Sequence, residues 1–183
     1  MRTHLFGWTL LIVMAAFPGT AAAQARMPHR GANAIGGEVG IFLPSQSGMT
    51  TGPDLDGTFE HYLTARNSVR FGVGWMRPEL EANHESKMRE VRVAGDLVHN
   101  WEGGKVHPFV GAGLGVYFLQ PKLNGSNAGA SAKKFGGTLL GGAEFFTSKT
   151  FAIKGEARYH IVTKSGGYDP SGLSLTIGLK SYF

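Results

Sequence analysis

Residues 173–183 of the chain read LSLTIGLKSYF, and this stretch decides the fold. Positions 173, 175, 177, 179 and 183 are apolar, with Ser181 breaking the run, whereas the positions between them hold Ser, Thr, Gly, Lys and Tyr. Successive side chains of a β-strand point to opposite faces, so the pattern predicts a strand with one apolar and one polar face. A wall with lipid on one side and a polar lumen on the other is built from such strands.

Seven more segments alternate in the same way, which brings the predicted count to eight strands. Besides the C-terminal strand from Gly172 to Phe183, they run from Ala34 to Leu43, Asp54 to Thr64, Val69 to Trp75, Val91 to Leu97, Val110 to Phe118, Phe135 to Phe145 and Phe151 to Ile161. The sequence therefore predicts an all-β fold, an eight-stranded antiparallel up-and-down transmembrane β-barrel.

Charged residues avoid one face of these predicted strands. The apolar face holds no Asp, Glu, Lys or Arg, and His61 is its one ionisable side chain. The opposite face carries Glu38, Asp56, Glu60, Arg70, Arg92, Asp96, Glu144, Lys154, Glu156, Arg158 and Lys180. A soluble barrel also alternates, but it must fill its interior with side chains, and here the glycines gather on the polar face. Since a lumen of about eight strands has little room, we expect the apolar face to point outward into lipid.

Composition sets the outer bounds. The chain has 183 residues, of which 42% are apolar, which fits one domain and is too polar for a helical membrane protein. Its 28 glycines are scattered through the alternating segments, as expected for glycine within curved strands. Because there is no cysteine, disulfides, thiolate nucleophiles and cysteine metal sites are excluded.

The N-terminus predicts a secretory signal peptide over residues 1–23, cleaved after Ala23, with the barrel domain over 24–183. Arg2 precedes an apolar run that ends at Phe17, and three alanines then supply the small-residue cleavage pattern. A membrane anchor is the competing interpretation. The run is shorter than the roughly 20 apolar residues that a spanning helix needs, and a Pro-Gly pair follows it, so a signal peptide is favoured.

The connections between the predicted strands alternate in length. Short, turn-like gaps follow the second, fourth and sixth strands, whereas the other gaps are mostly longer and rich in Gly, Ser, Asn, Pro and charge. The longer gaps run from Pro44 to Pro53, Pro78 to Lys87, Gln120 to Ala132 and Thr163 to Ser171. Outer-membrane barrels have short periplasmic turns and longer outer loops, so this alternation favours the same arrangement here.

The leader, the eight alternating segments, the glycine pairs at 36–37, 136–137 and 141–142, and the final strand together resemble the small bacterial outer-membrane β-barrel family, the OmpA- and OmpX-like and opacity-type proteins. The likeness covers nearly all of the chain after the leader but has no sharp motif. It implies the outer membrane of a Gram-negative cell and no further domain after Phe183. In that family, a terminal aromatic residue preceded by alternating apolar positions looks like the signal for the barrel-assembly machinery. Phe183, Leu179 and Ile177 match that signal, whereas Ser181 departs from it.

The charged face also predicts how the lumen is closed. Six acids and five bases in a narrow barrel indicate interlocked ion pairs, because an unpaired buried charge would cost several kcal/mol. We therefore expect a structural or surface-interaction role, with exposed outer loops carrying any recognition. Two alternatives stay open, namely a narrow channel for small or hydrophobic solutes and a soluble ligand-binding barrel.

Catalysis is not expected. Some barrels of this size modify lipid A with a His, a Ser and an acid on the membrane-facing wall, by nucleophile-plus-base chemistry. His61 and His99 would face outward, but neither has a serine two positions on, and His160 lies on the lumen face, where it fits the ion-pair network. No metal site or cofactor is expected either, because the other histidines lack the spacing of a zinc site.

The expected partners are outer-membrane lipid, lipopolysaccharide and the barrel-assembly machinery. Lysines in or beside the outer loops would pair with lipopolysaccharide phosphates as point charges; they are Lys122, Lys133, Lys134 and Lys164. The net charge of +5 would also suit nucleic acid, but an exported barrel would not meet it. We expect a monomer.

Overall fold

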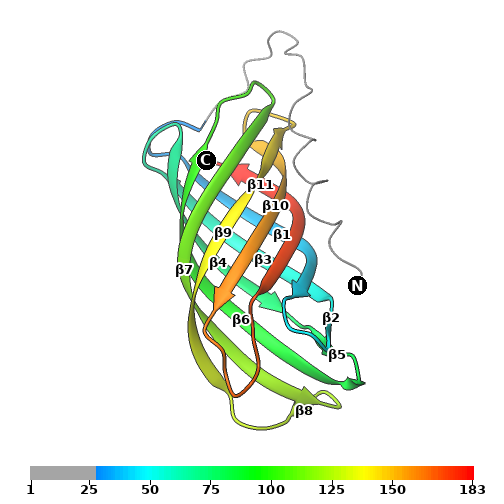
Figure 1. Ribbon diagram of the computed structural model, residues 1–183. Helices are drawn as coiled ribbons and strands as arrows, with labels where there is room; N and C mark the ends of the chain where they lie inside the picture. Colours follow the sequence, from blue (N-terminus) through cyan, green and yellow to red (C-terminus); the bar gives the residue numbers. More distant parts are fainter. Residues whose placement is uncertain (1–27) are drawn as a thin grey trace, which may run out of the picture.

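Alternating apolar and polar residues place eight long strands side by side in a closed wall (Figure 1). The computed structural model describes residues 28–183, so the predicted signal peptide over 1–23 lies outside the described residues. The long strands are β1 (Asn33–Pro44), β3 (Gly52–Tyr62), β4 (Asn67–Met76), β6 (Asn83–Asn100), β7 (Val106–Leu123), β9 (Ala132–Phe146), β10 (Phe151–Val162) and β11 (Gly172–Tyr182). Three two-residue strands lie in the connections: β2 (Met49–Thr50), β5 (Glu79–Leu80) and β8 (Ser126–Asn127). Within residues 28–183, no helix is long and apolar enough to span a membrane.

The sheet closes on itself. Each long strand pairs antiparallel with the long strands before and after it in the chain, and β1 pairs with β11 from Ala34 opposite Tyr182 to Pro44 opposite Gly172. Closure leaves no long strand with a free edge, which removes the hazard of edge-to-edge aggregation. The predicted eight-stranded antiparallel up-and-down barrel is confirmed.

The apolar face points outward along the whole wall. Val73 is 56% exposed, Leu114 77% and Ile177 60%, although a soluble protein would bury such side chains. The soluble barrel with an apolar interior is therefore wrong. The outward face is what a bilayer would cover, since contiguous apolar surface of this extent is not left in water.

The barrel has two unlike ends. The turn end holds the C-terminus and the connections 63–66, 101–105 and 147–150, of four or five residues each. The loop end holds the connections 45–51, 77–82, 124–131 and 163–171, of six to nine residues each. Figure 1 shows the C-terminus at one end and β2, β5 and β8 at the other. The predicted alternation of short turns and longer loops is confirmed.

Two strands are longer than predicted, and the loops beside them are shorter. The fourth predicted strand began at Val91 but β6 begins at Asn83, and the fifth ended at Phe118 but β7 ends at Leu123. The two strands pair as far as Ser86 opposite Leu123, so the expected loops over 78–87 and 120–132 are partly strand. Apolar alternation gives no signal there, because the outward residues of this extension are mostly charged.

Aromatic side chains mark both rims of the apolar wall. Near the loop end, Trp75 lies opposite Val91, and Val91 lies opposite Phe118, in one row across β4, β6 and β7. Near the turn end, the outward side chains include Phe145, which is 47% exposed, and Phe183, which is 68% exposed. Such girdles border the lipid-facing band of outer-membrane barrels.

Candidate functional site

The lumen is the candidate site, and every charged residue predicted to face it lies there. All of the predicted side chains are at most 8% exposed and come from β1, β3, β4, β6, β9, β10 and β11. They are Glu38, Asp56, Glu60, Arg70, Arg92, Asp96, Glu144, Lys154, Glu156, Arg158 and Lys180. Because successive side chains of a strand point to opposite faces, each of these residues faces the lumen when its apolar neighbours face lipid.

At the turn end, two carboxylates share one lysine. Lys180 Nζ lies 2.7 Å from Glu60 Oε2 and 2.6 Å from Glu144 Oε1. Arg70 Nε donates a second charged hydrogen bond to Glu60 Oε2, at 2.8 Å, and the Ser68 hydroxyl donates to Glu60 Oε1. Charge-assisted hydrogen bonds of this kind are about twice as strong as neutral ones, so these buried acids are well compensated.

In the middle of the lumen, Glu156 binds three cations. Its carboxylate lies 2.6 Å from Arg70 Nη1, 2.7 Å from Lys154 Nζ and 2.9 Å from Arg158 Nη2. The lysine continues to Glu38, at 2.5 Å, and the second arginine continues to Asp96, at 2.8 Å. Nine of the eleven predicted residues thus belong to one connected chain of ion pairs that crosses the barrel.

The other two predicted residues form a separate pair. Arg92 Nη2 donates to Asp56 Oδ1 at 2.6 Å, nearer to the loop end. A methyl group in place of the Gly74 hydrogen would overlap the Asp56 carboxylate, and one at Gly113 would overlap that of Asp96. Lumen-side glycines therefore make room for charged side chains, as the sequence predicts.

Two further buried carboxylates were missed by the sequence analysis. Asp54 is 1% exposed and Glu90 is 0% exposed, so the described lumen holds eight acids against five Lys and Arg. The expected near balance is therefore wrong. Both lie on the polar face of their strands. Asp54 begins the second predicted strand and Glu90 directly precedes the fourth, so following the alternation back from Asp56 and from Arg92 would have found them.

These two acids lie on either side of Met76, in one row across three neighbouring strands. The register pairs Asp54 with Met76, and Met76 with Glu90. Among residues 28–183, neither oxygen of Asp54 nor Oε2 of Glu90 has a hydrogen-bond partner. The hydroxyl of Tyr168, from the loop 163–171, donates to Glu90 Oε1. At the loop end, the buried Glu90 carboxyl group is thus bound by a loop side chain rather than by a cation.

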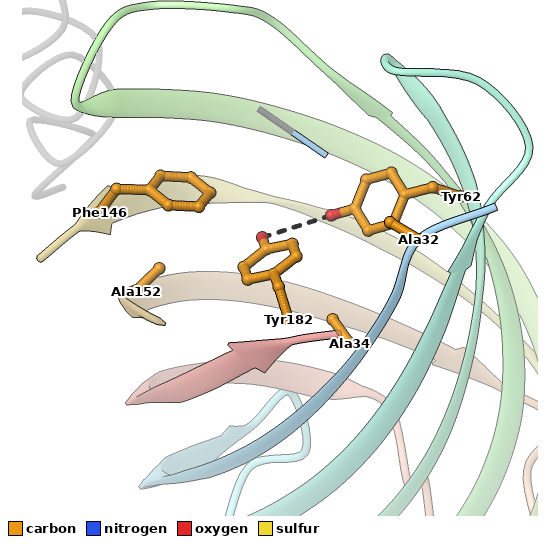
Figure 2. Packing of buried hydrophobic residues seen from close by; sticks show 6 residues of the cluster. All are labelled: Ala32, Ala34, Tyr62, Phe146, Ala152 and Tyr182. Carbon is orange, nitrogen blue, oxygen red and sulfur yellow. Dashed lines mark hydrogen bonds between the residues drawn. The ribbon is translucent and has the colours of Figure 1, made fainter. Parts of the chain in front are cut away.

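The lumen is not polar throughout, because apolar clusters occupy both ends. Figure 2 shows the turn-end cluster, in which the ring of Tyr182 lies between Tyr62 and Phe146, with small alanines beside it. The two tyrosine hydroxyls lie 3.4 Å apart. The loop-end cluster comprises Phe42, Met76, Tyr117, Leu119 and Val162. Each of these side chains lies on the face of its strand that was expected to be polar. Strand alternation therefore predicts which side chains face the lumen, but not that those at the two ends are apolar.

The described histidines form neither a catalytic site on the outer wall nor part of the ion-pair network. His160 takes part in no ion pair of the described residues; its Nδ1 lies 2.9 Å from the Tyr117 hydroxyl and its Nε2 lies 2.9 Å from Ser174 Oγ. Its predicted place in the ion-pair network is therefore wrong. The Ser–His contact has no carboxylate on the other ring nitrogen, and both residues are at most 1% exposed. Outward His61 and His99 instead meet Asn33 and Asn67, each at 2.8 Å.

The residues expected to form the assembly signal lie together on the outer face of β11 and at its end. Ile177 is 60% exposed, Leu179 53% and Phe183 68%. The backbone of Phe183 still pairs with Asn33, which ties the last residue to the first strand.

A family model for the outer membrane protein beta-barrel domain matches residues 9–183. The chain belongs to the outer membrane protein β-barrel family. Its members lie in the bacterial outer membrane, so the predicted location is confirmed. A comparison with curated protein sequences finds no significant match.

Several solved structures share the fold. Neisserial surface protein A has a TM-score of 0.65 at 14% identity, over 83% of this chain and 97% of its own. OprG of Pseudomonas aeruginosa has a TM-score of 0.65 at 13% identity, over 85% and 97%. Ail, the attachment invasion locus protein of Yersinia pestis, has a TM-score of 0.59 at 14% identity, over 84% and 99%. Ail has also been crystallised with the heparin analogue sucrose octasulfate. Identities this low show the fold alone.

One similar structure is an enzyme. The outer membrane enzyme PagL has a TM-score of 0.51 at 15% identity, over 81% of this chain and 98% of its own. The other three proteins are not named as enzymes. The shared fold therefore accommodates catalysis without requiring it.

Proposed function

We propose that this family member is a structural outer-membrane barrel whose lumen is closed by ion pairs and whose loops form a surface for interaction. The burial of the lumen cations is the observation that supports this most strongly. Each of the five is at most 2% exposed, so almost none of its surface is accessible to water; they are Arg70, Arg92, Lys154, Arg158 and Lys180. A conducting pore would leave such charges hydrated.

The connections at the loop end support the interaction part of the proposal. They are longer than the turns and include the short strands β2, β5 and β8. Loops on a rigid scaffold are the usual place for recognition, because they tolerate change without loss of the fold. The lipid around the wall and the lipopolysaccharide of the outer leaflet are the partners that these loops and their flanking lysines would meet first.

Bilayer recordings of the purified full chain test the closed lumen. The proposal expects no stable conductance steps from the wild-type barrel. Stable, ion-selective steps would favour the narrow channel instead. A matched variant with smaller lumen side chains, Arg92→Ala with Asp56→Ala, should show steps if the barrel inserts, which ensures that a silent wild type is not a failed insertion.

A cell assay tests the structural role. Cells that lack the protein should take up a large antibiotic or lyse in mild detergent more readily than cells that carry it. Restoring the full chain should reverse the defect, whereas a chain with 45–51 and 124–131 replaced by short Gly-Ser turns should restore integrity but not binding to surfaces. If neither property changes on deletion, the proposed role fails.

We further propose that the chain is not an enzyme. Its outward histidines are held by asparagines, and the Ser174–His160 contact is enclosed in the lumen. A nucleophile needs access to its substrate as well as a base. Incubation of the purified barrel with lipid A, followed by mass spectrometry, should leave the acyl chains intact; a lost or gained acyl chain would overturn this.

The assembly signal is proposed for Ile177, Leu179 and Phe183. Their outward side chains on the last strand support it, because an external machine can reach them before closure with β1. Replacing Phe183 by Ser should lower the amount of heat-modifiable barrel in the outer membrane while spontaneous folding into vesicles continues. Equal amounts of the two proteins in the membrane would contradict the proposal.

A further inference from the structure

A basic hollow lies on the outer surface of the wall, away from the lumen. It has a volume of about 570 Å³, and its lining includes Trp75, Arg77, Glu85, Lys87, Arg89 and Lys122. It belongs to the part of β6 and β7 that extends past the apolar band, together with the end of β4 and the residue after it. The volume falls within the range of about 300–1,000 Å³ typical of small-molecule sites, so it has room for a phosphorylated sugar.

The hollow holds more positive charge than the protein compensates. Lys87 and Lys122 lie directly opposite each other in the β6–β7 ladder, and like charges in that position destabilise a sheet. Glu79 Oε1 lies 2.5 Å from Lys87 Nζ and neutralises that lysine. Among the residues that the structure describes, no carboxylate forms an ion pair with Arg77, Arg89 or Lys122. An anion bound between these three cations would compensate their positive charge.

The height of the hollow on the wall identifies the kind of anion. The aromatic row that contains Trp75 and Phe118 marks the membrane–water interface at the loop end. Arg89 on β6 and Arg77, directly after the end of β4, each stand two residues beyond this row, which is about 7 Å of extended chain. Lipid phosphates lie just outside the interface, at this level. The Arg77 guanidinium also lies over the Trp75 ring, 5.7 Å from its centroid, which holds it beside the bilayer surface.

We propose that Arg77, Arg89 and Lys122 form a binding site for a phosphate group of lipopolysaccharide, in its lipid A part. Arginine suits this ligand because its planar fork donates two parallel hydrogen bonds to a phosphate. The indole of Trp75 adjoins the apolar band, so a ligand with acyl chains along the wall gains contacts that an anion in solution lacks. The inference rests on the outer-membrane location of the proposed function but not on the closed lumen.

Native mass spectrometry of the detergent-solubilised full chain, titrated with lipid A, tests the site. The triple variant Arg77→Gln, Arg89→Gln, Lys122→Gln should retain lipid A about tenfold or more weakly than wild type. The matched control removes three exposed cations from the turn end, Arg66→Gln, Lys105→Gln, Lys149→Gln, and should bind as wild type does. Equal weakening by both variants, or by neither, would overturn the proposal.

The choice of ligand separates lipid A from other anions. Wild type should bind lipid A that has lost its phosphates as weakly as the triple variant binds the intact lipid. Equal binding of the two lipids would overturn the phosphate site. If inorganic phosphate or a heparin fragment bound as tightly as lipid A, the site would serve an anion in solution or a sulfated polysaccharide, and the lipid proposal would fail.

Failure of this site and failure of the proposed function are distinguishable. The triple variant changes only outward side chains beyond the apolar band, so it should keep the heat-modifiable barrel and the silent bilayer recordings of wild type. Lost lipid binding with a silent barrel supports the site. Retained lipid binding in a conducting barrel refutes the closed lumen alone.

Discussion

The turn end and the loop end of the lumen differ in how their buried carboxylates are stabilised. At the turn end and in the middle, each buried carboxylate of the described lumen meets Lys or Arg within 2.9 Å, as Glu60, Glu144 and Glu156 do. At the loop end, Asp54 and Glu90 meet no such cation among the described residues, and Tyr168 from a loop covers Glu90. Because a buried ion pair is stable only when both partners remain, the first region should tolerate charge removal poorly and the second well.

The largest expected effect is at Glu156, which binds Arg70, Lys154 and Arg158. Changing it to Gln leaves these cations short of a counter-charge, and removing one partner of a buried pair costs about 3–5 kcal/mol. Urea unfolding in phospholipid vesicles measures this loss. The control Glu81→Gln, in an exposed loop, should leave the unfolding midpoint unchanged, and an equally small shift for Glu156→Gln would contradict the account.

Packing around the charges should produce the next largest effect. In Gly113→Ala the new methyl group meets the Asp96 carboxylate and the Gly95 carbonyl, whereas at Gly57, on the lipid side, it meets nothing within 4 Å. Overpacking of this kind costs about 1–3 kcal/mol, so Gly113→Ala should unfold at lower urea than Gly57→Ala. If the two variants unfold alike, the lumen has room for a methyl group beside Asp96, and the close packing inferred for it is wrong.

The loop end should respond more weakly, through Tyr168. Burial, together with the nearby Glu90 carboxylate, raises the pKa of the Tyr168 phenol well above its usual value, so it stays a donor throughout the physiological range. Tyr168→Phe removes that donor and should cost about 1–3 kcal/mol, the usual cost of leaving a buried acceptor without its hydrogen bond. The same variant should speed proteolysis within 163–171 but not within 147–150. Unchanged proteolysis of the loop would mean that Tyr168 does not hold it.

The smallest effect is expected at Asp54. Since no cation neutralises this buried acid, Asp54→Asn should change the free energy of unfolding by no more than about 1 kcal/mol, in either direction. Two residues along the same strand, Asp56 is paired with Arg92, and Asp56→Asn should cost about 3–5 kcal/mol. A loss at Asp54 as large as that at Asp56 would remove the contrast between the two regions.

The sequence predicts which face of the wall a side chain lies on better than it predicts which residue that side chain pairs with. Strand parity placed Glu60, Arg92 and Lys180 inside, because a period of two leaves each side chain a single choice of face. Parity could not tell that Glu60 shares Lys180 with Glu144, because the register between β3, β11 and β9 depends on turn geometry and on closure. The pairs therefore emerge only from the fold.

Misses at the two ends have physical reasons. Phe42 and Phe146 occupy lumen positions where apolar packing seals the barrel, so a search for polar residues on that face passes over them. The charged extension around Lys87 and Arg89 lies beyond lipid, where an outward residue need not be apolar. The basic hollow could not be predicted either. Its lining residues come from β6, β7 and the end of β4 with the residue after it, and only the pairing of these strands brings them together.

Two adjacent residues of β6 test the central claim most directly, because they face opposite media. Val93 is 49% exposed on the outer wall and Ala94 is 4% exposed toward the lumen. The chain has no cysteine, so Val93→Cys and Ala94→Cys each introduce a single thiol. In vesicles, a fluorophore on residue 93 should be quenched by lipids with spin-labelled acyl chains, and the thiol at residue 94 should resist a water-soluble reagent. An unquenched label at 93, or a thiol at 94 that reacts as fast as one at Ser47 in the loop 45–51, would contradict a lipid-facing wall around a closed lumen.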